Sequence, residues 1–419
     1  MKRPYTAMIY RCDGLLLLLE RMTVVNPKLI IYLVAFAAFL GPFTQTIYAP
    51  ILPEIQSDFR TSQFLVNMSI SIFTIVLAVM QIVYGPLTDR KGRRKVLLPG
   101  IALYILASIG CAYSDSIHQL LVFRAIQAAG IAAGSVVATT VIGDLFEGKL
   151  RGRAMGTFQM LVALGPVAGP VIGGFVGGRF GYQGIFVVLA AAGVLMFAAN
   201  FRYLRETKPE GGAGDSFQIR DFLSILVHPT GSAVILLGFI QYYTFYNFLV
   251  FLPDILDRYY KLSAEGKGMV FLPLSLMLVA GSFLGGRLQE RVDARKGLIA
   301  TSFFNVMAIV LFVFVSKFSL ALLVAGIFLF GLFFGLSLPV QTTLLTEPFL
   351  RQRATAIGVY NFFRYMGMAA GPLIGSFLYR WGEIPLLFGF AAAAFAGIVL
   401  FARRQLLTAG HLSVSSSGK

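Results

Sequence analysis

Long apolar runs recur along the whole chain, and each is long enough to cross a lipid bilayer. A spanning helix needs about 20 mainly apolar residues, because its backbone polar groups find hydrogen-bond partners only within the helix. Such runs lie at 28–50, 64–87, 95–114, 117–144, 152–178, 183–203, 229–253, 267–289, 297–316, 319–346, 353–379 and 383–402. The sequence therefore predicts an all-α membrane protein with twelve transmembrane helices.

The distribution of charge predicts how these helices are oriented. Only 13% of the residues are charged, and the net charge of +16 comes mostly from Lys and Arg in short loops between the apolar runs. Most of these cations lie in the loops on the side of the amino terminus, which is the cytoplasmic side by the positive-inside rule. We therefore expect a multi-pass protein of the cell membrane with both termini in the cytoplasm, membrane lipids as partners and no nucleic-acid partner.

Cysteine and histidine are scarce and scattered. The two cysteines are Cys12 and Cys111, and the three histidines are far apart in the sequence. Neither a disulfide framework nor a metal site follows from this pattern. The chain also lacks a metal-ligand pair or a nucleophile with a nearby base, so we expect no metal, no cofactor and no enzymatic activity.

An internal repeat divides the chain into two halves. Residues 85–90 resemble 286–291 at an offset of 201, and 150–154 resemble 350–354 at an offset of 200. Gly165, Gly169, Pro170 and Gly173 match Gly367, Gly371, Pro372 and Gly375 at an offset of 202. Because this offset covers six spans, both halves have the same orientation, which predicts two pseudo-symmetric six-helix bundles as a parallel repeat.

The predicted domains follow from this repeat. They are a cytoplasmic amino-terminal tail (1–27), a first six-helix bundle (28–203), a cytoplasmic linker with a short amphipathic helix (204–228), a second bundle (229–403) and a cytoplasmic carboxyl-terminal tail (404–419). Because Met22 stands just before the first span, the sequence leaves open whether residues 1–21 belong to the native chain.

Three motifs resemble those of the major facilitator superfamily. Residues 85–94 (GPLTDRKGRR) resemble its loop motif G-x-L-a-D-R-x-G-R-R. Arg124 with Gln127 resembles the fourth-span motif R-x-x-Q-G, and Ala128 in place of the last glycine resembles bicyclomycin-resistance exporters. The fifth-span glycines, with Pro170 and Gly174, resemble the motif of drug:H+ antiporters. The resemblance implies a monomeric secondary transporter that works by alternating access, exports small molecules or drugs, and uses the proton as its coupling ion.

The first motif also predicts a charged latch at the inner face. Asp89 is the one acid in a short loop of five cations, so we expect Arg93 or Arg94 to pair with Asp144, and Asp89 to cap the eleventh span near Arg351. Such pairs close one face of a transporter and break when its halves rock. The other predicted members of the latch are Arg90, Glu290 and Glu347. The alternative is that these charges only anchor the loops at lipid headgroups.

Two arginines inside spans are the strongest candidates for substrate binding. Ionised arginine at a helix centre costs about 2.5–3.5 kcal/mol on insertion scales, so each needs a reason to be there. We expect Arg124, with Gln127, and Arg364, with Asn361, to face a central cavity. A structural ion pair or hydrogen bonds to nearby carbonyl groups are the alternative explanations.

Polar and aromatic residues of two further spans are predicted to complete the lining. They are Gln241, Tyr242, Tyr246 and Asn247 in the seventh span and Gln45 and Tyr48 in the first, although the tyrosines also fit an interfacial belt. No Asp or Glu lies near the middle of a predicted span, so the simplest proton carrier is missing and the arginines favour a neutral or anionic small-molecule substrate. The sequence thus leaves two functions open: a proton-coupled efflux antiporter for drugs or other small organic molecules, and a carrier of an organic anion or metabolite.

Overall fold

The computed structural model describes residues 27–146, 148–208, 219–289, 291–349 and 353–416. Ten helices within these ranges are long and apolar enough to cross a membrane. Two of them, α7 (Gly148–Tyr203) and α13 (Arg353–Ser416), are too long for one crossing, and each has a break: α7 at Gly181 and α13 at Gly382 and Glu383. Dividing α7 and α13 at these breaks gives twelve spans in the described residues, which confirms the predicted fold class.

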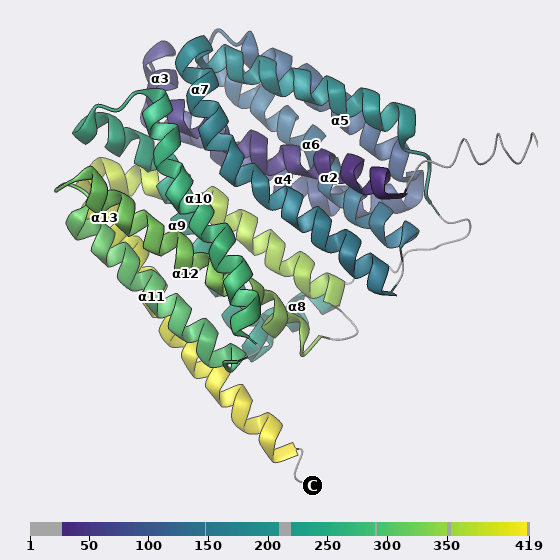
Figure 1. Ribbon diagram of the computed structural model, residues 1–419, viewed down its shortest axis with the longest axis vertical. Helices are drawn as coiled ribbons and strands as arrows, with labels where there is room; N and C mark the ends of the chain where they lie inside the picture. Colours follow the sequence, from purple (N-terminus) through teal and green to yellow (C-terminus); the bar gives the residue numbers. More distant parts are fainter. Residues whose placement is uncertain (1–26, 147, 209–218, 290, 350–352, 417–419) are drawn as a thin grey trace, which may run out of the picture.

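The helices form two bundles (Figure 1). The first bundle holds α2 (Pro27–Thr46), η1 (Ala49–Ile51), α3 (Leu52–Asp58), α4 (Gln63–Lys91), α5 (Arg93–Ala112), α6 (Ile117–Leu145) and α7. The second holds α9 (Pro229–Tyr260), α10 (Ala264–Leu288), α11 (Ala294–Val315), α12 (Leu320–Thr346) and α13. A short helix, α8 (Ile219–Val227), precedes α9, with Ile225 buried and Leu223 and Val227 exposed.

Helix caps repeat between the two bundles. The side chain of Ser62 accepts a hydrogen bond at the start of α4, and Ser263 does so at the start of α10. Ser116 and Ser319 cap α6 and α12 in the same way. A serine oxygen at this position satisfies one of the backbone N–H groups that a helix start leaves free. The repeat seen in the loop motifs therefore extends to the local signals that begin the helices.

The glycine motifs allow close helix packing within each bundle. A Cβ added to Gly165 would lie 2.9 Å from the Phe43 backbone nitrogen, and one added to Gly173 would overlap the carbonyl oxygen of Ile47. In the second bundle, a Cβ on Gly371 would lie 2.8 Å from the carbonyl oxygen of Tyr243. The first motif thus packs α7 against α2, and its counterpart packs α13 against α9, as small residues do in membrane helix pairs.

The two bundles are joined toward one end of the molecule. We call it the Glu54 end; it holds α3 and the starts of α4 and α10, while the loop at Gly92 and residues 204–208 lie at the opposite, Arg93 end. Asn67 donates to Ser376, Ser71 donates to the Ala369 carbonyl oxygen, and Ser275 donates to the Pro166 carbonyl oxygen, all from one bundle to the other. The structure is therefore closed between the bundles at the Glu54 end.

The last helix extends beyond its predicted end. α13 continues to Ser416, whereas the sequence placed the end of the last span at residue 402 and a tail after residue 403. Residues 403–409 (RRQLLTA) are mostly good helix formers and include neither proline nor glycine, so nothing in them ends the helix at residue 402. The predicted amino-terminal tail, apart from Pro27, lies outside the described residues.

Candidate functional site

Arg364 lies in a tyrosine-rich cluster in the part of α13 that precedes the break at Gly382, and it is partly exposed. Its Nη1 donates to Asn361 Oδ1 at 3.0 Å, and its Nη2 donates to the hydroxyl of Tyr242 on α9. The guanidinium carbon lies 4.2 Å from the centre of the Tyr242 ring and 5.4 Å from that of Tyr360, within the range of cation–π attraction. The Nε of Arg364 is buried without a hydrogen-bond partner. The cluster therefore orients a cation but leaves one of its donors free.

The neighbouring residue joins the two bundles. Gln81 of α4 donates from Nε2 to the hydroxyl of Tyr365 at 3.1 Å and to Ser135 Oγ of α6 at 3.2 Å. Gln81, Ser135 and Tyr365 are all partly exposed, as Arg364 is. A molecule held at Arg364 would therefore lie beside hydrogen-bonding groups of both bundles, the arrangement that allows one site to face either side of the membrane in turn.

Arg124 does not face an open cavity in this structure, contrary to the expectation from the sequence. Its side chain is fully buried within the first bundle. Its Nη1 donates to Gln127 Oε1 at 2.7 Å and its Nη2 to the Tyr48 hydroxyl at 3.2 Å. The guanidinium is stacked between the rings of Phe73 (4.1 Å) and Tyr48 (4.5 Å). Stacking and hydrogen bonds offset its burial, which corresponds to the alternative that the sequence left open.

Most of the other predicted lining residues are also buried inside a bundle. Gln45 donates to Thr74, Tyr48 is hydrogen-bonded to Ser69, and Gln127 donates to Ser108. Gln241 belongs to a hydrogen-bonded network with Ser337 and Gln341, which also accepts from Tyr360. Tyr246 and Asn247 are buried. Of the ten predicted substrate-binding residues, the structure leaves Tyr242, Asn361 and Arg364 partly exposed. A substrate-binding role for the buried ones stays a prediction for another conformation.

The predicted latch is partly assembled at the Arg93 end. Arg93 Nε donates to Asp144 Oδ2 at 2.8 Å, its Nη2 donates to Asp144 Oδ1 at 3.2 Å, and Nη2 lies 3.6 Å from Asp89 Oδ1. Because α5 and α6 belong to the same bundle, the Arg93–Asp144 pair does not itself join the bundles. Arg94 donates to the Phe201 carbonyl oxygen instead of to Asp144.

The expected contact of Asp89 with the start of α13 is not seen in the described residues. The Asp89 side chain is about half exposed and pairs with Arg93. Arg90 and Glu347 are exposed, and Glu290 and Arg351 lie outside the described residues. A bond between Asp89 and α13 would cross the bundles, and these are joined at the other end of the molecule. The gating role of this set stays a prediction.

Glu206, which the sequence interpretation missed, ties the segment after α7 to the latch. Its Oε1 accepts from the backbone N–H of Arg93 at 2.7 Å, and its Oε2 accepts from that of Arg94 at 3.3 Å. Partial burial opposes ionisation of this carboxyl, but the backbone N–H groups of Arg93, Lys208, Arg94 and Thr207 outweigh it and lower its pKa. The positive φ of Gly92, 99°, brings the chain to this acid at a place where a Cβ would overlap the carboxylate. The sequence signal that could have identified Glu206 is its position directly after the sixth span, on the same side of the membrane as the loop at Gly92.

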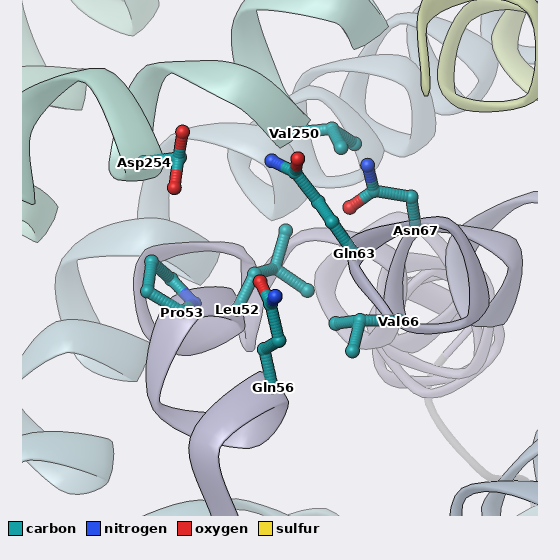
Figure 2. A pocket seen from close by; sticks show the side chains of 8 residues that line it. All are labelled: Leu52, Pro53, Gln56, Gln63, Val66, Asn67, Val250 and Asp254. Carbon is teal, nitrogen blue, oxygen red and sulfur yellow. The ribbon is translucent and has the colours of Figure 1, made fainter. Parts of the chain in front are cut away.

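Lys267 is a second residue that sequence interpretation missed. It was assigned to the boundary of the eighth span, but its side chain is only 1% exposed and contacts Glu54 of the other bundle. Figure 2 shows a pocket nearby, with Leu52, Pro53, Gln56, Gln63, Val66 and Asn67 of the first bundle on one side and Val250 and Asp254 of α9 on the other. Within the described residues, no group of three His, Cys, Asp or Glu side chains is placed to hold a metal ion.

Known relatives of the chain are transporters. It is 28% identical over 356 residues to the uncharacterized MFS-type transporter YdgK of Bacillus subtilis, over 82% of this chain and 88% of YdgK. It is 31% identical over 183 residues to Citrate exporter 1 of Aspergillus niger, over 43% of this chain and 35% of the exporter. It is 28% identical over 210 residues to the multidrug resistance protein MdtL of Escherichia coli, over 48% of this chain and 54% of MdtL. The match thus spans only about a third of the length of the citrate exporter and about half of the length of MdtL.

Solved structures share the fold. A bacterial homologue of the human lysosomal transporter Spinster, in an inward-facing and occupied conformation, superposes with a TM-score of 0.75 at 19% identity over 92% of this chain and 98% of that one. The human organic anion transporter MFSD10 superposes with a TM-score of 0.66 at 19% identity over 90% of this chain and all of that one.

The family assignment rests on almost the whole described chain. The family model described as Major Facilitator Superfamily matches residues 34–230 and 234–413, so both bundles and the site between them are included. The chain therefore belongs to the Major Facilitator Superfamily, and it is a multi-pass membrane transporter of small molecules and not an enzyme.

Proposed function

We propose that this transporter exports small organic molecules that carry an anionic group, in exchange for protons. One central site, at Arg364, would open to either side of the membrane in turn. The observation that carries the proposal is a partly exposed arginine whose guanidinium has only neutral neighbours: Tyr242, Tyr360 and Asn361. Among the ion pairs formed by the described residues, none includes Arg364.

The environment of Arg364 favours an anion over a cation. A charge taken out of water is costly unless an opposite charge answers it, and hydroxyl and amide partners compensate it only in part. An anionic group of the substrate beside the guanidinium would complete this compensation. A guanidinium presents a planar fork that matches a carboxylate or phosphate, so the site suits such groups in particular.

Export and proton coupling are supported by sequence resemblance. The fifth-span glycine motif, which packs α7 against α2, resembles that of drug:H+ antiporters, and relatives include a protein named as a citrate exporter and one named as a multidrug resistance protein. We further propose that the protein acts as a monomer in the cell membrane with the basic Arg93 end in the cytoplasm. On that orientation, closure at the Glu54 end makes this the inward-facing state.

The test is transport in proteoliposomes with an imposed proton gradient. A panel of mono-, di- and tricarboxylates and one permanently cationic dye would be compared at two pH values. Hydrogen bonds to charged groups contribute about 1.5–3 kcal/mol, so Arg364→Gln should raise KM for the transported anion about 10- to 150-fold. Arg364→Lys should restore part of the loss, because an ammonium keeps the charge but not the fork.

Arg380→Gln is the matched control, because Arg380 is an exposed cation of the same helix. It should transport as the wild type does. Strong export of the cationic dye by the wild type, together with unchanged anion transport by Arg364→Gln, would contradict the proposed substrate class. Transport that ignores the proton gradient would contradict the proposed coupling alone.

A further inference from the structure

Lys267, in the first turn of α10, is placed between carboxylates of the two bundles. Its Nζ lies 2.8 Å from Glu54 Oε1 of α3 and 3.1 Å from Asp257 Oδ1 of α9. Glu54 belongs to the first bundle, while Asp257 and Lys267 belong to the second. One ammonium group therefore pairs within its own bundle and across the interface at the same time.

The three side chains differ in how far they are exposed, and therefore in how much each needs an opposite charge. The Lys267 side chain is 1% exposed, whereas those of Glu54 and Asp257 are 42% and 47% exposed. A buried ammonium needs a counterion in every conformation that keeps it buried, because losing all partners leaves an uncompensated charge. Of the two carboxylate oxygens of Glu54, Oε1 accepts a hydrogen bond from Lys267, while Oε2 is buried without a partner in the described residues.

The backbones of the two bundles are in close contact beside Lys267. A Cβ on Gly268, next to Lys267, would lie 2.7 Å from the Pro170 carbonyl oxygen of α7, and one on Gly174 would lie 2.6 Å from the Ala264 carbonyl oxygen. Any opening of the Glu54 end must separate these backbones. The same movement must draw Glu54 away from Lys267, while Asp257 moves together with Lys267.

We propose that Lys267 is a positioning residue of the transport cycle, which locks the Glu54 end closed through Glu54 and keeps Asp257 as its partner when that end opens. On opening, the ion pair between Lys267 and Glu54 breaks, while the pair between Lys267 and Asp257 remains. It rests on the alternating-access part of the proposed function and does not depend on the substrate class.

The lock predicts different effects for its two acids, which can be measured without transport. Spin labels at Tyr113→Cys of the first bundle and Phe318→Cys of the second, both at the Glu54 end and 79% and 80% exposed, report the opening by their separation. Cys12 and Cys111 would be replaced by alanine. In lipid nanodiscs, Glu54→Gln should raise the ratio of open to closed molecules about tenfold, since partial exposure screens the lost pair. Glu54→Lys, which places two cations together, should raise it further.

Asp257→Asn is the matched control, because it removes the other partner of the same lysine within one bundle. It should lower thermal stability but leave the label distances near those of the wild type. Unchanged distances in both Glu54 variants, or equal opening in Glu54→Gln and Asp257→Asn, would overturn the lock. If the distances respond as expected while the wild type fails to move anions, the substrate proposal fails and the lock stands.

Discussion

Gly173 and Gly174 are adjacent in α7, yet the same substitution should act on them in different ways. The position of Gly174 faces α10 across the bundle interface, where a Cβ would lie 2.6 Å from the Ala264 carbonyl oxygen and 3.1 Å from Gly268 Cα. The position of Gly173 faces Ile47 inside the first bundle, where a Cβ would overlap a backbone carbonyl oxygen. Gly174→Ala should therefore disfavour one conformation, whereas Gly173→Ala should disfavour the fold.

The size of the first effect follows from the geometry. Neither contact of a Gly174 Cβ is with a flexible side chain, so the helices must move apart, and such overpacking costs about 1–3 kcal/mol. The gain in helix propensity of alanine over glycine is the same in both conformations and cancels. Because the clash exists only while the Glu54 end is closed, the ratio of open to closed molecules should rise about 5- to 150-fold.

Label distances and thermal unfolding together separate the two variants. With the Tyr113→Cys and Phe318→Cys label pair, Gly174→Ala should populate the longer distance with little change in melting temperature. Gly173→Ala should lower the melting temperature and leave the distances of the folded fraction alone. Gly389→Ala, whose Cβ would meet no atom within 4 Å, should change neither. A Gly174→Ala protein with wild-type distances would refute the reasoning, because the interface would then tolerate the added methyl group.

Two further predictions concern the Arg93 end. Asp144→Asn leaves the buried guanidinium of Arg93 without its best partner, so it should cost up to about 3–5 kcal/mol of stability, measurable by thermal unfolding, whereas the exposed-site change Arg90→Gln should cost little. Glu206 has a lowered pKa in the folded state, so its contribution to stability is present above its unfolded pKa of about 4.3 and is lost as pH falls through the folded value. The acid-induced fall in melting temperature should therefore be smaller in Glu206→Gln, and an identical pH profile in both proteins would contradict the role of this cap.

The fold was predictable because its signals are local and repeated. Apolar runs of bilayer length located the spans, and the breaks at Gly181 and Gly382 fall in the short gaps that the sequence placed between spans. The pairing of Arg93 with Asp144 was also predictable, since a loop cation and an acid at the neighbouring helix end meet wherever the helices end together. The cross-bundle pair of Lys267 with Glu54 was not, because it joins residues far apart in sequence and depends on which end of the molecule is closed.

The site was harder to predict because a polar residue in a membrane helix has two ways to be satisfied. The amide groups of Gln241 and Gln127 form their hydrogen bonds within a bundle. Nothing in the spacing of these residues distinguishes them from Asn361, which accepts a hydrogen bond from Arg364 in a partly exposed cluster. The two arginines show the same ambiguity. Arg124 is enclosed by two aromatic rings and its hydrogen bonds, so its charge acts on its own bundle.

The repeat therefore duplicates the packing of the bundles but not the chemistry of their interface. The α7–α2 and α13–α9 contacts are built by matching glycines. At the candidate site, in contrast, the second bundle contributes the cation Arg364 and the first bundle contributes the neutral groups of Gln81 and Ser135. A substrate held by charge on one bundle and by hydrogen bonds on the other can lose the weaker set first when the bundles rock. Release would then begin at the Gln81 side, because a neutral hydrogen bond contributes about half as much as a charge-assisted one.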